Sequence, residues 1–260
     1  MAMDAGSSWI EAGIEILRKI QRTQSEPIER ASQICAEAIG AGGLVHLFGT
    51  GHSRIPVEEM FPRYGSYPGF NPIVELSMTF HTQVVGANGQ RQAMFIERMP
   101  GLAEVILSNF QFAPKDALIV FSASGLGAVV VEMARGARRR GLPVIAVTSV
   151  AQSQAGDVDE AVGARLLDEA DVIIDLCTPA GDALTHLDGL AETPVGPGST
   201  LAAVAVADAI KVRTAELLLA MGKMPPVITS ATEVGRERSE ELFEAAYREH
   251  ARRAARTLAT

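Results

Sequence analysis

Two short segments rich in serine and glycine have the composition of phosphate-binding loops. The first, residues 49–53, reads Gly-Thr-Gly-His-Ser, and the second, residues 122–125, reads Ser-Ala-Ser-Gly. Glycine lets the backbone turn sharply and bring its N–H groups close to a ligand, and serine hydroxyls donate to phosphate oxygens. Such a loop, leading into a helix, can hold an anion without lysine or arginine. The predicted phosphate-binding residues of the two segments are Gly49, Gly51, Ser53, Ser122, Ser124 and Gly125.

Each segment follows a short apolar run that is typical of a buried parallel strand. Five such runs alternate with helical patterns, which indicates crossover connections and a parallel sheet. They are residues 44–48, 73–76, 117–121, 144–148 and 172–176. We predict a flavodoxin-like, doubly wound five-stranded α/β sheet in the order 2-1-3-4-5. Taken alone, either Ser/Gly segment is as consistent with a tight connection between strand and helix as with a binding loop. In this strand order, however, both segments fall at the switch point between strands 1 and 3, where such sheets bind ligands.

The flanking sequence predicts helices at both ends of the chain. Apolar residues at helical spacing indicate a helix over residues 8–22, and Ser25 is the predicted N-cap of a second helix. A long helix is predicted over residues 199–221, and a charged one from about residue 235 onward. We interpret the chain as one domain over 41–222, with N-terminal helices over 1–40 and a C-terminal helical extension over 223–260.

The composition of the chain disfavours several classes of binding partner. The net charge of −8 disfavours nucleic acid as a partner, because nucleic-acid binding normally depends on a basic surface. Cys35 and Cys177 form neither a disulfide framework nor a metal spacing, and the acids near His186 do not complete a metal site. With no signal-peptide pattern and no apolar run long enough to span a bilayer, we expect a cytoplasmic protein that binds no membrane and no metal.

Nucleotide-binding motifs match poorly. The chain has no Gly-Lys-Ser/Thr sequence, which excludes a P-loop. A dinucleotide fingerprint needs a third glycine where the chain has Arg54. Glu75 near the end of the second predicted strand is placed as a ribose-binding acid would be, so dinucleotide binding stays open as a minor alternative.

The sequence resembles the sugar isomerase (SIS) domain family, and most closely its UPF0309 branch. The resemblance rests on residues 46–53, 121–125 and 198–200, and it covers about residues 31–221. It implies a phosphosugar ligand, no cofactor, and Thr200 as a further phosphate-binding residue. It also implies a homodimer or homotetramer whose ligand sites lie at subunit interfaces. Members of the family include isomerases, an etherase, deaminating enzymes and regulators that only sense sugar phosphates.

The resemblance to the phosphoheptose isomerases of this family implies a catalytic base in this chain. They resemble the chain in a Glu-Glu pair followed by arginine, here Glu58, Glu59 and Arg63, and the likeness matches Glu59 to the base. The match needs a gap of about one helical turn, and the late helix lacks the histidine that those enzymes carry in the stretch corresponding to residues 201–206. Glu58 and Glu59 are equally consistent with first-turn acids that interact favourably with a helix dipole.

Three other residues are catalytic candidates. Glu75 could act as a base at the end of its strand, or be a surface residue on an edge strand. His52 and His81 could open a sugar ring as acid or base, since histidine titrates near neutral pH. His52 could instead orient its loop, and His81 could be an ordinary loop residue. His46, within a buried run, is interpreted as a core histidine with satisfied hydrogen bonds.

The leading hypothesis is a sugar-phosphate binding protein that catalyses aldose–ketose isomerisation. A carboxylate with a raised pKa would move a proton between adjacent carbons through an enediol. An etherase or lyase acting on an amino-sugar phosphate, with elimination at C3, is an alternative. The third possibility is a sensor without turnover, although the roughly 40 residues before the first strand are not basic and do not indicate a DNA-binding domain.

Overall fold

The computed structural model describes residues 4–79, 89–190 and 192–258. Its centre is a parallel sheet in the order β2-β1-β3-β4-β5, as predicted. The strands are β1 (Val45–Gly49), β2 (Phe70–Pro72), β3 (Ala117–Phe121), β4 (Val144–Thr148) and β5 (Val172–Asp175). Strands β1 and β3 pair along their whole length, with Gly49 opposite Phe121. The two predicted loops therefore leave the sheet side by side.

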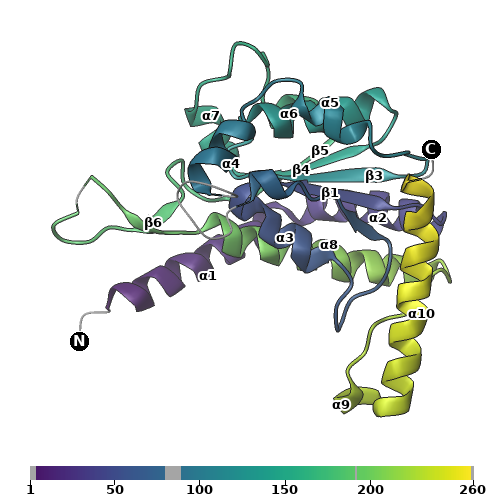
Figure 1. Ribbon diagram of the computed structural model, residues 1–260. Coiled ribbons are helices and arrows are strands. Elements are labelled where there is room, and N and C mark those ends of the chain that lie inside the picture. The colour runs from purple at the N-terminus through teal and green to yellow at the C-terminus, as the bar shows by residue number, and fades with distance from the viewer. Residues whose placement is uncertain (1–3, 80–88, 191, 259–260) are drawn as a thin grey trace.

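Helices cover both faces of the sheet (Figure 1). One layer holds α1 (Ala5–Thr23), α2 (Ser25–Gly40), α3 (Ile55–Met60) and α8 (Ser199–Ala220). The opposite layer holds α4 (Gln90–Ile96), α5 (Leu102–Leu107), α6 (Ala128–Arg139) and α7 (Val150–Ala155). The buried apolar residues form two clusters, one on each side of the sheet, because successive side chains of a strand point to opposite faces. Ile16 and Ile20 of α1 belong to the first cluster, so this helix is part of the domain core.

Two further elements extend from the body of the molecule. A small antiparallel hairpin, β6 (Ala183–Thr185) and β7 (Val195–Pro197), precedes α8. The short α9 (Ala231–Val234) and the long α10 (Arg236–Ala254) form the C-terminal arm, whose far end stands away from the sheet in Figure 1. Arg253 attaches this arm to the core, because its guanidinium donates to the carbonyls of Ile39 and Gly43, both at 2.9 Å. Within the described ranges, no helix is long and apolar enough to cross a bilayer.

Two local predictions were wrong. Strand β2 is Phe70–Pro72 instead of residues 73–76, because residues 70–72 pair with β1. The N–H of Ile73 still donates to the Leu47 carbonyl at 2.8 Å, and the chain leaves the sheet after it. Ser25 is the first residue of α2 rather than its N-cap; Gln24 holds the cap position, and its side chain makes no capping hydrogen bond. Short helices α4, α5 and α7 and the hairpin were not predicted, since none carries a long periodic pattern.

Candidate functional site

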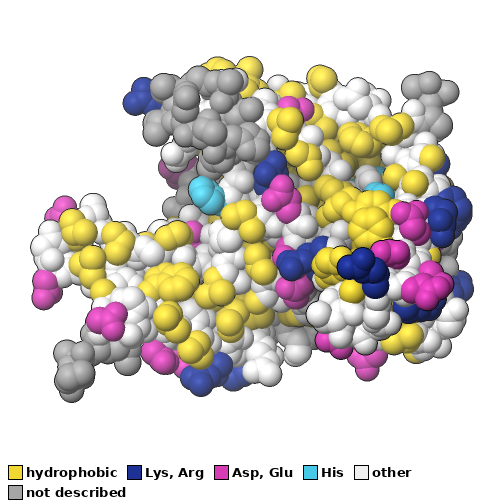
Figure 2. Space-filling view, turned by 60° about the horizontal axis from the view of Figure 1, so that its bottom comes forward, with side chains coloured by type: hydrophobic (Ala, Val, Ile, Leu, Met, Phe, Trp, Pro, Cys, Tyr) yellow, Lys and Arg dark blue, Asp and Glu magenta, His cyan; other side chains and the backbone are white. Residues whose placement is uncertain are grey.

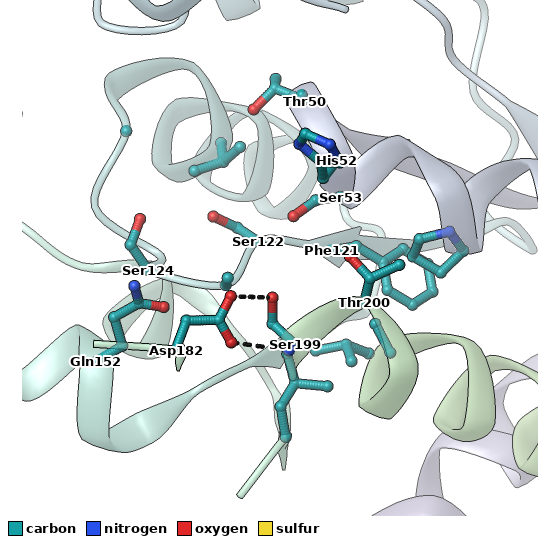
Figure 3. A pocket seen from close by; sticks show the side chains of 18 of the residues that line it. Thr50, His52, Ser53, Phe121, Ser122, Ser124, Gln152, Asp182, Ser199 and Thr200 are labelled. Carbon is teal, nitrogen blue, oxygen red and sulfur yellow. Dashed lines mark hydrogen bonds between the residues drawn. The ribbon is translucent and has the colours of Figure 1, made fainter. Parts of the chain in front are cut away.

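The loops after β1 and β3 open into one pocket of about 310 Å³. Ser53 comes from the first loop, Ser122 and Ser124 come from the second, and their side chains lie along the same hollow (Figure 3). The first turn of α8 forms a third wall with Ser199 and Thr200. Three hydroxyl-bearing segments that are far apart in sequence therefore meet at the carboxyl end of the sheet, where a ligand is expected.

Steric requirements explain the glycines of the first loop. A Cβ atom on Gly49 would lie 2.3 Å from the carbonyl oxygen of Ser53, so only glycine allows the chain to fold back this closely. Gly51 has a φ of 54°, in the left-handed region that glycine adopts at little cost. The N–H of Ser53 donates to the carbonyl of Thr50 at 3.0 Å and closes the turn. The loop then continues through η1 (Gly51–Arg54) into α3.

The second loop uses its serines to hold its own backbone. The Oγ of Ser122 accepts from the N–H of Gly125 at 3.1 Å, and the Oγ of Ser124 accepts from the N–H of Leu126 at 3.4 Å. Because both oxygens act as acceptors in these bonds, their hydroxyl protons remain able to donate to a ligand oxygen. Gly125 has a φ of 62°, and its carbonyl accepts from the N–H of Leu166 at 2.8 Å.

An internal carboxylate occupies the N-terminus of α8. Asp182 accepts from the N–H of Gly198 at 3.2 Å. It also accepts from the N–H and the hydroxyl of Ser199, both at 2.7 Å (Figure 3). The N-cap residue Gly198 has no side chain to provide these acceptors, so Asp182 does so from the hairpin side. Its negative charge also interacts favourably with the helix dipole. The N-terminus of α8 is therefore already occupied by the chain's own carboxylate.

A second carboxyl group, Glu97, lines the same pocket. Thr50 of the first loop donates its hydroxyl to Oε2 of Glu97 at 2.8 Å. Burial raises the pKa of Glu97, and neither the hydrogen bond from Thr50 nor the charge of Arg98 lowers it enough to cancel this effect. Among the described residues that line the pocket, none is lysine or arginine. An anionic ligand would therefore be held by hydroxyls, by backbone N–H groups and by the N-terminus of α6.

The structure brings together most of the predicted site residues. Those lining the pocket are Gly51, His52, Ser53, Ser122, Ser124 and Thr200. Gly49 and Gly125 shape the loops without lining the pocket. His81 lies outside the described residues. His52 is exposed on η1 at the pocket wall.

The two predicted glutamates lie elsewhere. Glu59 lines a separate hollow of about 360 Å³ between α3 and α8. There its carboxylate pairs with Arg63 at 2.8 Å and with the buried Lys211 at 3.5 Å, and Lys211 also donates to the Glu59 carbonyl at 2.9 Å. Glu75 caps the turn η2 (Leu76–Met78) by accepting from the N–H of Ser77 at 3.2 Å and its hydroxyl at 2.7 Å. Neither side chain lines the pocket between the Ser/Gly loops.

His46 is a core residue, in agreement with its interpretation from the sequence. It is fully buried, with Nε2 3.4 Å from Oδ2 of Asp116 and Nδ1 3.2 Å from Nδ2 of Asn71. Cys35 and Cys177 are both free thiols. In the part of the chain that the structure describes, no group of three or more metal-binding side chains comes together.

Sequence reasoning missed several pocket residues. Thr50 and Ser199 belong to the segments that it singled out, so their hydroxyls could have been included. Asp182 and Gln152 follow no recognisable pattern. Glu97 lies at the end of a seven-residue helix, 47 positions from its partner Thr50, and neither a glycine turn nor a predicted strand marks it.

Comparisons with known proteins add independent information. The family model of the SIS domain matches residues 8–149. A UPF0309 protein of Streptomyces coelicolor is 32% identical over 224 residues, which cover 85% of this chain and 86% of the relative. A UPF0309 protein of Brucella anthropi is 35% identical over 217 residues, with 82% and 86% covered. Among solved structures, a phosphoheptose isomerase from Neisseria gonorrhoeae has 15% identity and a TM-score of 0.47, covering 79% of this chain and 94% of its own.

Proposed function

Because this chain belongs to the SIS domain family and matches UPF0309 proteins over most of its length, we propose that it binds a sugar phosphate in the pocket between its two Ser/Gly loops. The phosphate lies against Ser53, Ser122, Ser124 and Thr200, and the sugar extends toward the wall that carries Thr50 and Glu97. The family relationship that the sequence motifs indicated is confirmed by the family match and by the relatives.

One observation carries this proposal: three hydroxyl-bearing segments line a single pocket. The hydroxyls of Ser122 and Ser124 already accept from backbone N–H groups, which orients them, and their protons are left for a ligand. The N-terminus of α6 adds partial positive charge. A hydrogen bond to an ionised group contributes about 1.5–3 kcal/mol, so a few such donors can hold a phosphate dianion without a cationic side chain.

For the reaction we propose aldose–ketose isomerisation of the bound sugar phosphate, without a cofactor. In this reaction a carboxylate removes a proton from one sugar carbon and returns it to the next through an enediol. The pocket suits the reaction because it combines phosphate donors with a carboxyl group and with the apolar side chains of Pro56, Phe121 and Val130. Its volume of about 310 Å³ falls within the range of small-molecule sites.

We further propose that the protein works as a homodimer or homotetramer, with the sites near subunit contacts. Helix α8 presents large apolar side chains to solvent, since Val212 and Leu219 are 71% and 65% exposed. Ile10 of α1 is also largely exposed. Hydrophobic side chains are spread over the face turned forward in Figure 2, and contact with a second copy would remove them from water.

The binding proposal is tested by titrating a panel of hexose, heptose and amino-sugar phosphates into the protein in a calorimeter. We expect a Ser122→Ala, Ser124→Ala variant to bind its best ligand at least tenfold more weakly, since each lost hydrogen bond to a charged group costs about 1.5–3 kcal/mol. Ser108→Ala is the matched control, because Ser108 is an exposed serine at the end of α5, outside the pocket. Unchanged affinity in the double variant would contradict the site.

The reaction is tested with the same panel in deuterated water. Incorporation of deuterium at C2, with conversion between aldose and ketose, is the expected result. Loss of a C3 substituent with formation of an unsaturated product would instead identify a lyase. Tight binding with no exchange at any carbon would leave the protein a sensor.

A further inference from the structure

The carboxyl group of Glu97 is held firmly at the pocket wall. Its own N–H donates to the carbonyl of Ala93 at 3.0 Å, which ends α4, and its carbonyl accepts from the N–H of Val129 at 3.1 Å in the first turn of α6. The backbone at this position is thus tied to two helices. The side chain then reaches Thr50, whose hydroxyl donates to Oε2 at 2.8 Å.

This contact joins the carboxyl group to the phosphate loop. Thr50 stands between Gly49, the last residue of β1, and Gly51, the first residue of η1. A ligand phosphate held by Ser53 would therefore lie on the same short loop that orients Glu97. Loop and carboxyl group are positioned together before any ligand binds, which is the condition for efficient proton transfer.

The other carboxyl groups considered are committed to structural contacts. Asp182 lines the pocket, but its two oxygens accept three hydrogen bonds from the start of α8. Glu59 is paired with Arg63 and Lys211 in a different hollow. Glu75 caps a turn. Glu97 differs, because within the described residues its carboxylate forms no ion pair and accepts from the Thr50 side chain alone, although the charge of nearby Arg98 acts on its pKa.

We propose that Glu97, oriented by Thr50, is the catalytic residue that carries the proton between the two carbons of the sugar. The assignment rests on the proposed sugar-phosphate chemistry of this pocket. It also replaces Glu59, which the resemblance to phosphoheptose isomerases implied. The group that moves the proton thus comes from the C-terminal end of α4, which lies on the opposite face of the sheet from α3.

The proton transfers balance without a cofactor. In the open-chain aldose, the Glu97 carboxylate removes the proton on C2, and the C2–H electron pair becomes the C1=C2 double bond. The carbonyl electrons move to O1, which takes a proton from water to give the enediol. The O2–H proton then returns to water, its electrons form the C2=O2 carbonyl, and the double-bond pair takes the proton of the Glu97 carboxylic acid at C1. Glu97 ends ionised, as it began.

Burial suits Glu97 to this task. A base removes a carbon-bound proton better when its pKa is raised toward the working pH, provided that it is still ionised there. Burial raises the pKa of Glu97, and the hydrogen bond from Thr50 opposes this rise without cancelling it. Thr50 is in this sense a positioning residue that also affects the pKa of its neighbour.

The test compares variants in two measurements, sugar-phosphate binding and deuterium exchange at C2, after the wild-type protein has shown both. For Glu97→Gln we expect exchange to fall 10²–10⁴-fold while binding changes less than about threefold, because glutamine still accepts from Thr50 but cannot take a proton. Glu160→Gln, at an exposed position outside the pocket, is the matched control and should exchange at the wild-type rate. Thr50→Val should move the acidic limb of the rate profile to higher pH, because the hydrogen bond that lowers the pKa of Glu97 is lost.

Two results would overturn the inference and leave the proposed function standing. One is exchange at the wild-type rate in Glu97→Gln, particularly if Glu59→Gln abolishes it. The other is an acidic limb that does not move in Thr50→Val. A wild-type protein that binds no sugar phosphate would instead remove the proposed function itself.

Discussion

Replacing Asp182 by asparagine should move stability and phosphate affinity in opposite directions. Asp182 holds the start of α8 by accepting from two backbone N–H groups and one hydroxyl. An asparagine can keep the two N–H contacts through its carbonyl oxygen and donate to the Ser199 hydroxyl, but it loses the negative charge at the helix N-terminus. The cost is about 0.5–1 kcal/mol, the contribution of a charge near a helix end.

The same change removes a negative charge from a pocket proposed to hold a dianion. Relief of that repulsion should strengthen phosphate binding by about 1 kcal/mol, which is roughly fivefold in Kd. Asp182→Ala goes further, because the capping contacts disappear as well, and should cost about 1–3 kcal/mol of stability. Each kcal/mol lowers the melting temperature by about 2–4 °C in a domain of this size.

Thermal unfolding with and without inorganic phosphate measures both effects at once. Without phosphate, Asp182→Asn should melt a few degrees below wild type; with phosphate, its melting temperature should rise more than that of wild type. Asp188→Asn is the control, since Asp188 is an exposed acid close by in the chain, outside the pocket. If Asp182→Asn lowered stability and phosphate affinity together, Asp182 would be a ligand contact and our view of this end of the pocket would be wrong.

Two other substitutions test the framework of the site. Gly49→Ala should lower stability by about 1–3 kcal/mol and weaken sugar-phosphate binding, because its Cβ would meet the carbonyl of Ser53 at 2.3 Å. Gly181→Ala is the control and should melt like wild type, because no neighbouring atom would lie within 4 Å of its Cβ. Burial acts to raise the pKa of Asp116, but hydrogen bonds from His46 and two backbone N–H groups outweigh it, so the pKa is lowered from its ordinary value. A carboxylate with a lowered pKa stabilises the fold above its unfolded value and loses that contribution as the pH falls through the folded one. Asp116→Asn should therefore cost about 2 kcal/mol near neutral pH, and the gap between the urea unfolding curves of variant and wild type should narrow progressively as the pH falls below about 4. A gap that stays the same from neutral to acidic pH would contradict this.

Local sequence patterns predicted an element correctly where all residues of a short segment lie in the same kind of environment. The buried strands β3 and β4 have the predicted boundaries, because strands covered on both faces read as continuous apolar runs between turns. Strand β2 was misplaced because the apolar residues after it resemble a strand. Pairing of Phe70 and Asn71 with β1, together with the Asn71–His46 hydrogen bond, selects the true strand, and these contacts involve residues about 25 positions apart.

The sequence by itself determined the fold class, the strand order and the two hydroxyl-bearing loops, since each follows from the order of short motifs along the chain. Only the tertiary structure decided which acid lies in the pocket. Lys211, 152 positions away on α8, binds Glu59 in another hollow, whereas Thr50 and the start of α6 bring Glu97 to the wall beside the first Ser/Gly loop. A carboxyl group acquires its chemical role from its burial and its neighbours, and long-range packing sets both.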